Sequence, residues 1–199
     1  MPATIDYYFS PVSPWTYLGH ERFAELAERH HATVRVKPVD LGKVFAVSGG
    51  LPLKQRAPQR QAYRLIELAR WRDHLRLPLT VQPKYFPAPQ DAACRFILAA
   101  REESELAAMR LAGACMKACW AEERDVADEA TLRAIATEQG FDAAALAATA
   151  ATPAVTDRYA AFTAEAIETG VFGSPTYIVD GEPFWGQDRL DFVERKLAT

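Results

Sequence analysis

Strand-like segments stand near the two ends of this chain, and the long stretch between them is helical in character. Residues 4–9 and 34–37 carry the β-branched and aromatic side chains typical of strands, and an amphipathic helix is predicted between them. Near the other end, residues 177–179 and 183–185 are apolar runs separated by Asp180-Gly181, a pair that favours a tight hairpin. We therefore expect the two ends of the chain to meet in one sheet.

Helix signals dominate the middle of the sequence. Asp128 and Thr152 are good N-caps, and Gly140 and Gly170 stop the helices that follow them. We expect helices over residues 58–75, 90–103, 104–121, 128–139 and 152–169, and a closing helix that Gln187-Asp188 caps. Because the hairpin follows the helices, we predict a discontinuous α/β domain, residues 1–45 and 170–199, interrupted by an all-helical insertion, residues 46–169.

Composition narrows the function classes. The net charge of -3 and the pI near 5.8 provide no basic field for binding nucleic acid. No apolar run approaches the roughly 18 residues that span a bilayer, and no leader pattern is present, so we expect no membrane partner and a cytoplasmic location. We interpret the three cysteines as core residues rather than as a disulfide framework or metal site: Cys94, Cys115 and Cys119.

Ser13-Pro14 lies where the first strand gives way to a helix. Serine before proline is a good helix N-cap, which explains Ser13 without any catalytic role. The same position presents free N–H groups and the positive end of a helix dipole, a setting that lowers the pKa of a nearby thiol. Taken alone, the residue types favour the capping interpretation.

Ser174-Pro175 stands just before the strand at residues 177–179. This is the context of a cis-proline loop, in which the backbone of Ser174 would pair with an extended ligand, although a proline that merely begins a strand fits equally well. Together with Ser13, the loop has the layout of a thioredoxin-type active site in which Ser13 and Thr16 replace both cysteines. The pair excludes dithiol chemistry and suggests that the thiol arrives with a ligand.

Other catalytic types find less support. A Ser-His-Asp hydrolase would need a histidine near Ser13, and His20 lies about two turns further along the same helix. The sequence contains no glycine-rich phosphate-binding motif, so a nucleotide enzyme is not indicated. Arg56, Arg60 and Arg64 recur at helical spacing and form either a solvated face or a binding site for a ligand's carboxylates. Asp188, likewise, either caps the last helix or binds an ammonium group.

The chain resembles the 2-hydroxychromene-2-carboxylate isomerases and kappa-class glutathione transferases, which have a thioredoxin-like fold with a large helical insertion. The resemblance lies in the segment Tyr8 to Gly19 with its Ser-Pro-Trp-Thr, in Tyr85-Phe86-Pro87, and in residues 172–176 (FGSPT) and 184–190 (FWGQDRL). It implies that glutathione supplies the sulfur. Ser13 would stabilise the thiolate, Ser174 and Pro175 would bind the peptide backbone, and Gln187-Asp188 would lie near the γ-glutamyl end.

Two positions depart from the family pattern. Arg60 falls where many members have lysine, and Gly50 stands where many have asparagine, in a loop that contacts glutathione or substrate. We predict a glutathione-dependent isomerase that acts on an aromatic carboxylate and forms a homodimer. A kappa-type transferase or peroxidase is the first alternative, and a non-catalytic thioredoxin-like peptide-binding module is the second.

Overall fold

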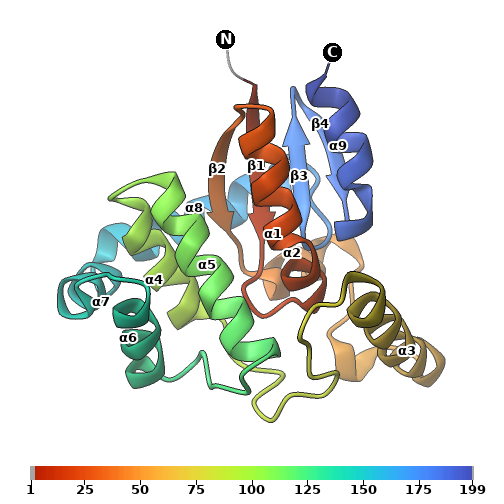
Figure 1. Ribbon diagram of the computed structural model, residues 1–199, viewed down its shortest axis with the longest axis horizontal. Helices are drawn as coiled ribbons and strands as arrows, with labels where there is room; N and C mark the ends of the chain where they lie inside the picture. Colours follow the sequence, from red (N-terminus) through yellow and green to blue (C-terminus); the bar gives the residue numbers. More distant parts are fainter. Residues whose placement is uncertain (1–2, 199) are drawn as a thin grey trace.

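The computed structural model describes residues 3–198 and brings the two ends of the chain together in a four-stranded sheet (Figure 1). The strands are β1 (Thr4–Phe9), β2 (Thr33–Pro38), β3 (Thr176–Val179) and β4 (Glu182–Trp185), in the order β2-β1-β3-β4. β1 pairs with β2 in parallel and with β3 antiparallel. The predicted α/β, thioredoxin-like fold with a helical insertion is confirmed.

Local turn chemistry explains the hairpin between β3 and β4. Val179 pairs with Glu182, so the loop consists of Asp180 and Gly181 alone. Both residues have positive φ, 50° and 80°, which is the backbone of a type I′ turn. The Asp-Gly pair thus sets the register that places Trp185 opposite Thr176, beside the Ser174-Pro175 loop.

Helices cover both faces of the sheet (Figure 1). α1 (Pro14–Arg29) and α9 (Leu190–Leu197) cover one face, while α2 (Leu41–Ser48) and α8 (Pro153–Glu168) lie against the other. The remaining helices are α3 (Pro58–Leu75), α4 (Asp91–Arg101), α5 (Glu105–Trp120), α6 (Glu129–Glu138) and α7 (Ala143–Ala150), with 3₁₀ turns at Leu53–Gln55 and Gln187–Arg189.

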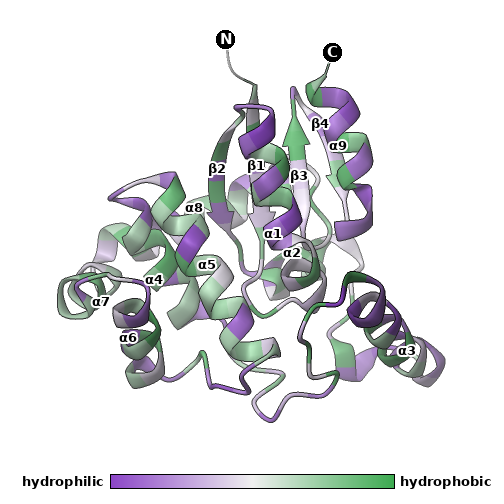
Figure 2. Ribbon diagram, in the orientation of Figure 1, coloured by the Kyte–Doolittle hydropathy of each residue, from purple (hydrophilic) through white to green (hydrophobic). Residues whose placement is uncertain are grey.

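The larger hydrophobic core is shared by the sheet and the helical block. Tyr7 and Phe9 of β1 stack on each other, with ring centroids 4.5 Å apart, and the same core includes Trp120 of α5. α3 differs, because only Arg64 and Leu68 of its side chains are buried, and Figure 2 shows it as largely hydrophilic. α3 therefore packs at the edge of the core and leaves most of its surface exposed.

Some local expectations need correction. α2 lies in a region for which the sequence signals predict no helix; the Asp40 side chain caps it by accepting from the Gly42 and Lys43 N–H groups. Asp188 does not cap the closing helix, because a 3₁₀ turn intervenes and α9 begins at Leu190 without a side-chain cap among the described residues. The division into two domains stays a prediction, and its boundary at residue 45 falls inside α2.

Candidate active site

Ser13 lies at the junction of β1 and α1 and is 7% exposed. Its hydroxyl accepts a hydrogen bond from the Thr16 N–H at 3.3 Å and donates to the Ser174 carbonyl at 3.4 Å. Both distances are longer than is usual for such bonds. The predicted N-cap is therefore present, but it holds the hydroxyl weakly and leaves it available to a ligand.

The Ser174-Pro175 peptide bond is cis, which decides between the two alternatives that the sequence left open. Ser174 is tied to the start of α1 through its side chain, which accepts from the Ser10 N–H at 2.9 Å and lies 2.7 Å from the Thr16 hydroxyl. Within residues 3–198 the N–H of Ser174 forms no hydrogen bond, and its carbonyl accepts only the long bond from Ser13. The backbone here can pair with an extended ligand.

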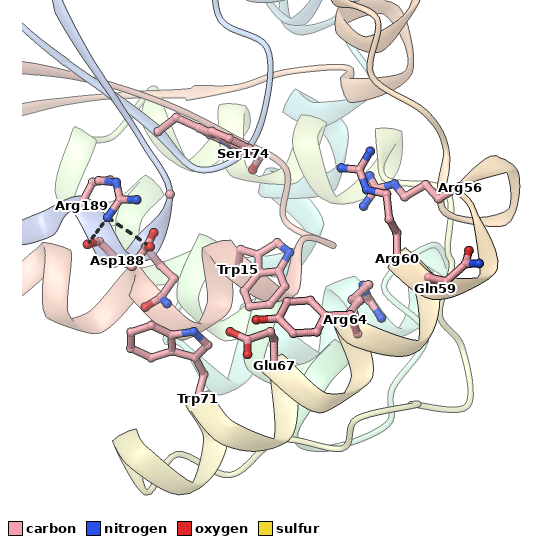
Figure 3. Close-up of a pocket in the computed structure, with 14 residues that line it drawn as sticks. Trp15, Arg56, Gln59, Arg60, Arg64, Glu67, Trp71, Ser174, Asp188 and Arg189 are labelled. Atoms are coloured by element: carbon pink, nitrogen blue, oxygen red, sulfur yellow. Dashed lines mark hydrogen bonds and ion pairs between the residues drawn. The ribbon is translucent and has the colours of Figure 1, made fainter.

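Two adjoining cavities meet at this junction, with volumes of about 610 and 660 Å³. The first, drawn in Figure 3, extends past Glu67 and Trp71 to Asp188. The second contains Ser13 and Gln90. Six residues line both cavities, so that the two form one continuous site: Trp15, Arg56, Arg60, Arg64, Ser174 and Trp185.

Gln187 and Asp188 form the far end of the first cavity. Gln187 is buried and held by Arg22, which donates to its side chain and, at 2.8 Å, to its backbone carbonyl. Asp188 is partly exposed, and its carboxylate lies 3.3 Å from the guanidinium of Arg189, the contact drawn in Figure 3. An ammonium group entering this end would meet the Asp188 carboxylate.

The three arginines of α3 and the loop before it are not equivalent. Arg60 is exposed, whereas Arg56 is half-buried and donates through Nε to the Leu51 carbonyl at 2.8 Å. Arg64 is only 8% exposed, so a solvated face does not describe it. Burial lowers the pKa of Arg64 to about 10, which leaves it charged at neutral pH.

Close backbone approaches shape the second cavity. A Cβ atom on Gly50 would lie 2.2 Å from the Phe45 ring, and one on Gly173 would lie 2.2 Å from Nε1 of Trp185. Glycine at both positions lets aromatic rings lie directly on the loops. Sequence reasoning missed Phe45 and Gln90 as lining residues of the second cavity. Phe45 lies on the unpredicted α2, and the Gln90 side chain is positioned by a hydrogen bond to the Val39 carbonyl.

The rival chemistries find no support in the described residues. His20 is buried between the Tyr7 hydroxyl, at 3.2 Å, and the Met109 carbonyl, at 3.0 Å, and no histidine among residues 3–198 bonds to Ser13. Burial lowers the pKa of His20 to about 4, so it is neutral near pH 7. No group of His, Cys, Asp or Glu residues suited to a metal occurs in residues 3–198.

The cysteines lie in the core, as predicted. All three are free and buried, and burial raises the pKa of each thiol; the residues are Cys94, Cys115 and Cys119. None lines either cavity, so this part of the chain offers the site no thiol. Over the same residues, no helix has the length and apolar character required to cross a membrane.

Comparisons with known proteins cover nearly the whole chain. Residues 4–198 match the family model of the DSBA-like thioredoxin domain. A 2-hydroxychromene-2-carboxylate isomerase of Sphingobium xenophagum is 31% identical over 198 residues, 99% of each chain. A solved structure of a 2-hydroxychromene-2-carboxylate isomerase superimposes with a TM-score of 0.83 at 28% identity, covering 98% of this chain and 94% of the other. Glutathione S-transferase kappa 1 of Rattus norvegicus is 22% identical over 99% of this chain and 92% of its own.

Proposed function

This chain belongs to the family of 2-hydroxychromene-2-carboxylate isomerases and kappa-class glutathione transferases, within the DSBA-like thioredoxin domains, and we propose that it is a glutathione-dependent isomerase of the hydroxychromene-carboxylate type. One observation carries the proposal. The Ser13 hydroxyl lies weakly held where α1 meets the cis-proline loop, in a site that has no thiol of its own.

The residues of the site suit glutathione in both charge and hydrogen bonding. The unpaired N–H of Ser174, next to Pro175, matches the backbone of the cysteinyl residue. Asp188, which follows the buried Gln187, provides a negative group for the γ-glutamyl ammonium at one end of the first cavity. Arg60 provides a positive group for a carboxylate at the wall that the two cavities share.

Ser13 would act on the sulfur. A hydroxyl that donates to a thiolate, at the positive end of the α1 dipole, favours the ionised form and lowers the pKa of the thiol. Bound glutathione would supply a thiolate that adds reversibly to the conjugated substrate, so that a former double bond can rotate before elimination. Thr16 would take no part in this chemistry, because its hydroxyl is already bound to Ser174.

The second cavity suits a planar aromatic substrate. Phe45, Phe86 and Trp185 line it, and it opens beside Ser13. Gly50 keeps the loop above it free of a side chain and leaves room for the Phe45 ring. We therefore place the aromatic carboxylate here and glutathione in the first cavity and along the cis-proline loop.

The decisive experiment follows the isomerisation of 2-hydroxychromene-2-carboxylate by its absorbance change, with and without glutathione. We expect activity that requires glutathione and that S-methylglutathione, which has no free thiol, does not support. Equal rates without any thiol would refute the proposal. Calorimetry with glutathione at millimolar concentration tests the peptide-binding alternative, because that alternative predicts no detectable heat.

A second enzymatic function is favoured by the relationship to glutathione S-transferase kappa 1. A panel of electrophiles and peroxides, assayed beside the chromene carboxylate, distinguishes a transferase or peroxidase from an isomerase by the ratio of kcat/KM values. Two further expectations stay proposals: the homodimer, which light scattering would test, and the cytoplasmic location, which fractionation of the source cells would test.

A further inference from the structure

Among the residues that the structure describes, Arg64 is a buried cation without a counter-ion. It projects from α3 and is 8% exposed. Its guanidinium forms no hydrogen bond or ion pair with any residue in 3–198, and Nη2 in particular is buried and unpaired. By contrast, Arg22 donates to Gln187, and Arg101 lies within ion-pair distance of Glu105. An uncompensated buried charge is costly, which indicates that a ligand supplies the missing acceptor.

The surroundings of Arg64 are aromatic. Its guanidinium lies 5.1 Å from the centre of the Phe86 ring and 5.7 Å from that of Trp120. These contacts partly stabilise the charge, but neither ring accepts the parallel hydrogen bonds that a guanidinium donates. The positive charge of Arg56 disfavours the charged form of Arg64. The nearby Glu67 carboxylate pairs instead with Arg70, at an N–O distance of 2.6 Å. The described residues therefore leave the guanidinium fork free.

We propose that Arg64 binds the carboxylate of the aromatic substrate and so determines which substrates this enzyme accepts. Arg64 lines both cavities, at the wall between the glutathione side and the side that contains Ser13. A planar carboxylate matches the fork of a guanidinium, and a planar ring attached to it matches the aromatic lining. The inference rests on the proposed function, because that function places an aromatic acid in the second cavity.

Burial distinguishes the substrate's carboxylate from those of glutathione as the partner of Arg64. Arg60 is exposed at the same wall and is suited to a flexible peptide carboxylate that remains partly in water. Arg64 is enclosed between Phe86 and Trp120, where a charge is best matched by a desolvated group on an apolar ring. The substrate's carboxylate and one carboxylate of glutathione would thus each have an arginine, one turn of α3 apart.

The test uses chromone-2-carboxylate, a stable planar acid, as a probe in calorimetry with the full chain saturated with glutathione. We expect Arg64→Gln to weaken binding of the probe roughly 10- to 100-fold, as the loss of a charge-assisted pair implies. Arg64→Lys should be intermediate, because it keeps the charge and loses the fork. Arg72→Gln on the same helix, which pairs with Asp73 and lines neither cavity, is the matched control and should bind as wild type does.

Further arms separate the outcomes. Wild type should bind the probe at least roughly tenfold more tightly than its methyl ester, a comparison that requires no variant to fold. Equal affinities for acid and ester, no binding of the acid to wild type, or a loss of glutathione affinity in Arg64→Gln with the probe unaffected would each overturn the inference. Failure of wild type to isomerise the chromene, with Arg64-dependent binding of the probe retained, would instead refute the proposed function alone.

Discussion

Replacement of Ser13 by alanine distinguishes its role as a helix cap from its proposed role at the sulfur, because the two roles contribute different free energies. As an N-cap, Ser13 makes one bond of 3.3 Å to the Thr16 N–H, and loss of such a cap costs about 1 kcal/mol. For a chain of 199 residues this lowers Tm by roughly 2–4 °C. As the donor to a thiolate, the same hydroxyl would contribute about 3–4 kcal/mol, or roughly 10²–10³ in kcat. A small loss of stability should therefore accompany a large loss of turnover.

Thr152→Ala provides the matched control. Thr152 caps α8 in the same way, accepting from the Val155 N–H at 3.4 Å before a proline at the first helical position, and it lies in neither cavity. The two variants should lose similar amounts of Tm, measured by circular dichroism. Only Ser13→Ala should lose glutathione-dependent turnover and the ultraviolet absorbance of the bound thiolate.

Ser13→Asp makes the test more stringent. Aspartate is a good N-cap, and its charge suits the positive end of the helix dipole, so Tm should match wild type or exceed it. The carboxylate would repel a thiolate, so turnover should be lost as in Ser13→Ala. If Ser13→Ala keeps wild-type kcat/KM, or if Thr152→Ala loses as much, the assignment of Ser13 to the sulfur is refuted.

Three further predictions test other parts of the structure. Gly173→Ala places a Cβ atom 2.2 Å from Trp185 Nε1 and should weaken glutathione binding about tenfold or more in calorimetry. The control is Gly140→Ala, where φ is 80° and a Cβ atom would have nothing within 4 Å; it should lower stability and leave the affinity for glutathione unchanged. Burial lowers the pKa of His20 to about 4, so between roughly pH 6.5 and 4 the imidazole is protonated in the unfolded chain but neutral in the folded one. The free energy of unfolding should therefore fall by up to about 3 kcal/mol as the pH falls through this window. Urea titrations of His20→Gln should lack this pH-dependent loss of stability. A thiol-reactive aryl disulfide should label none of the cysteines in the native protein and all of them in denaturant, without affecting activity beforehand: Cys94, Cys115 and Cys119.

Sequence reasoning worked best where the signal is local. The Asp180-Gly181 turn and the proline and cap signals at the ends of α8 are set by neighbouring residues, and each is present in the structure. It failed at Asp188, because Gly186, with φ of 111°, turns the chain into a 3₁₀ segment before α9 begins. It also failed for α2, an eight-residue helix in which Val44 is the one residue classed as buried.

The three arginines at positions 56, 60 and 64 show why a candidate site is harder to predict than a fold. The sequence left open whether Arg56, Arg60 and Arg64 form a solvated face or a binding site; all three line both cavities, although Arg56 precedes α3 and has extended backbone. Their difference in burial arises from Phe86 and Trp120, which reach Arg64 from segments distant in the sequence. Spacing along one helix cannot reveal which guanidinium lacks a counter-ion.

The two positions that would carry cysteines in a dithiol enzyme, Ser13 and Thr16, have different surroundings in this structure. Thr16 is fully buried, lines neither cavity, and joins its hydroxyl to Ser174 at 2.7 Å, so it serves the scaffold by fixing the cis-proline loop against α1. Ser13 lines the second cavity, and its hydroxyl donates to the Ser174 carbonyl at 3.4 Å, a long bond in which a stronger acceptor can replace the carbonyl. A thiolate carried by a ligand is such an acceptor, because bonds to an ionised sulfur or oxygen are stronger than those between neutral groups. Under the proposed function, a fixed loop and one weakly held donor would together suit a sulfur that arrives with the ligand.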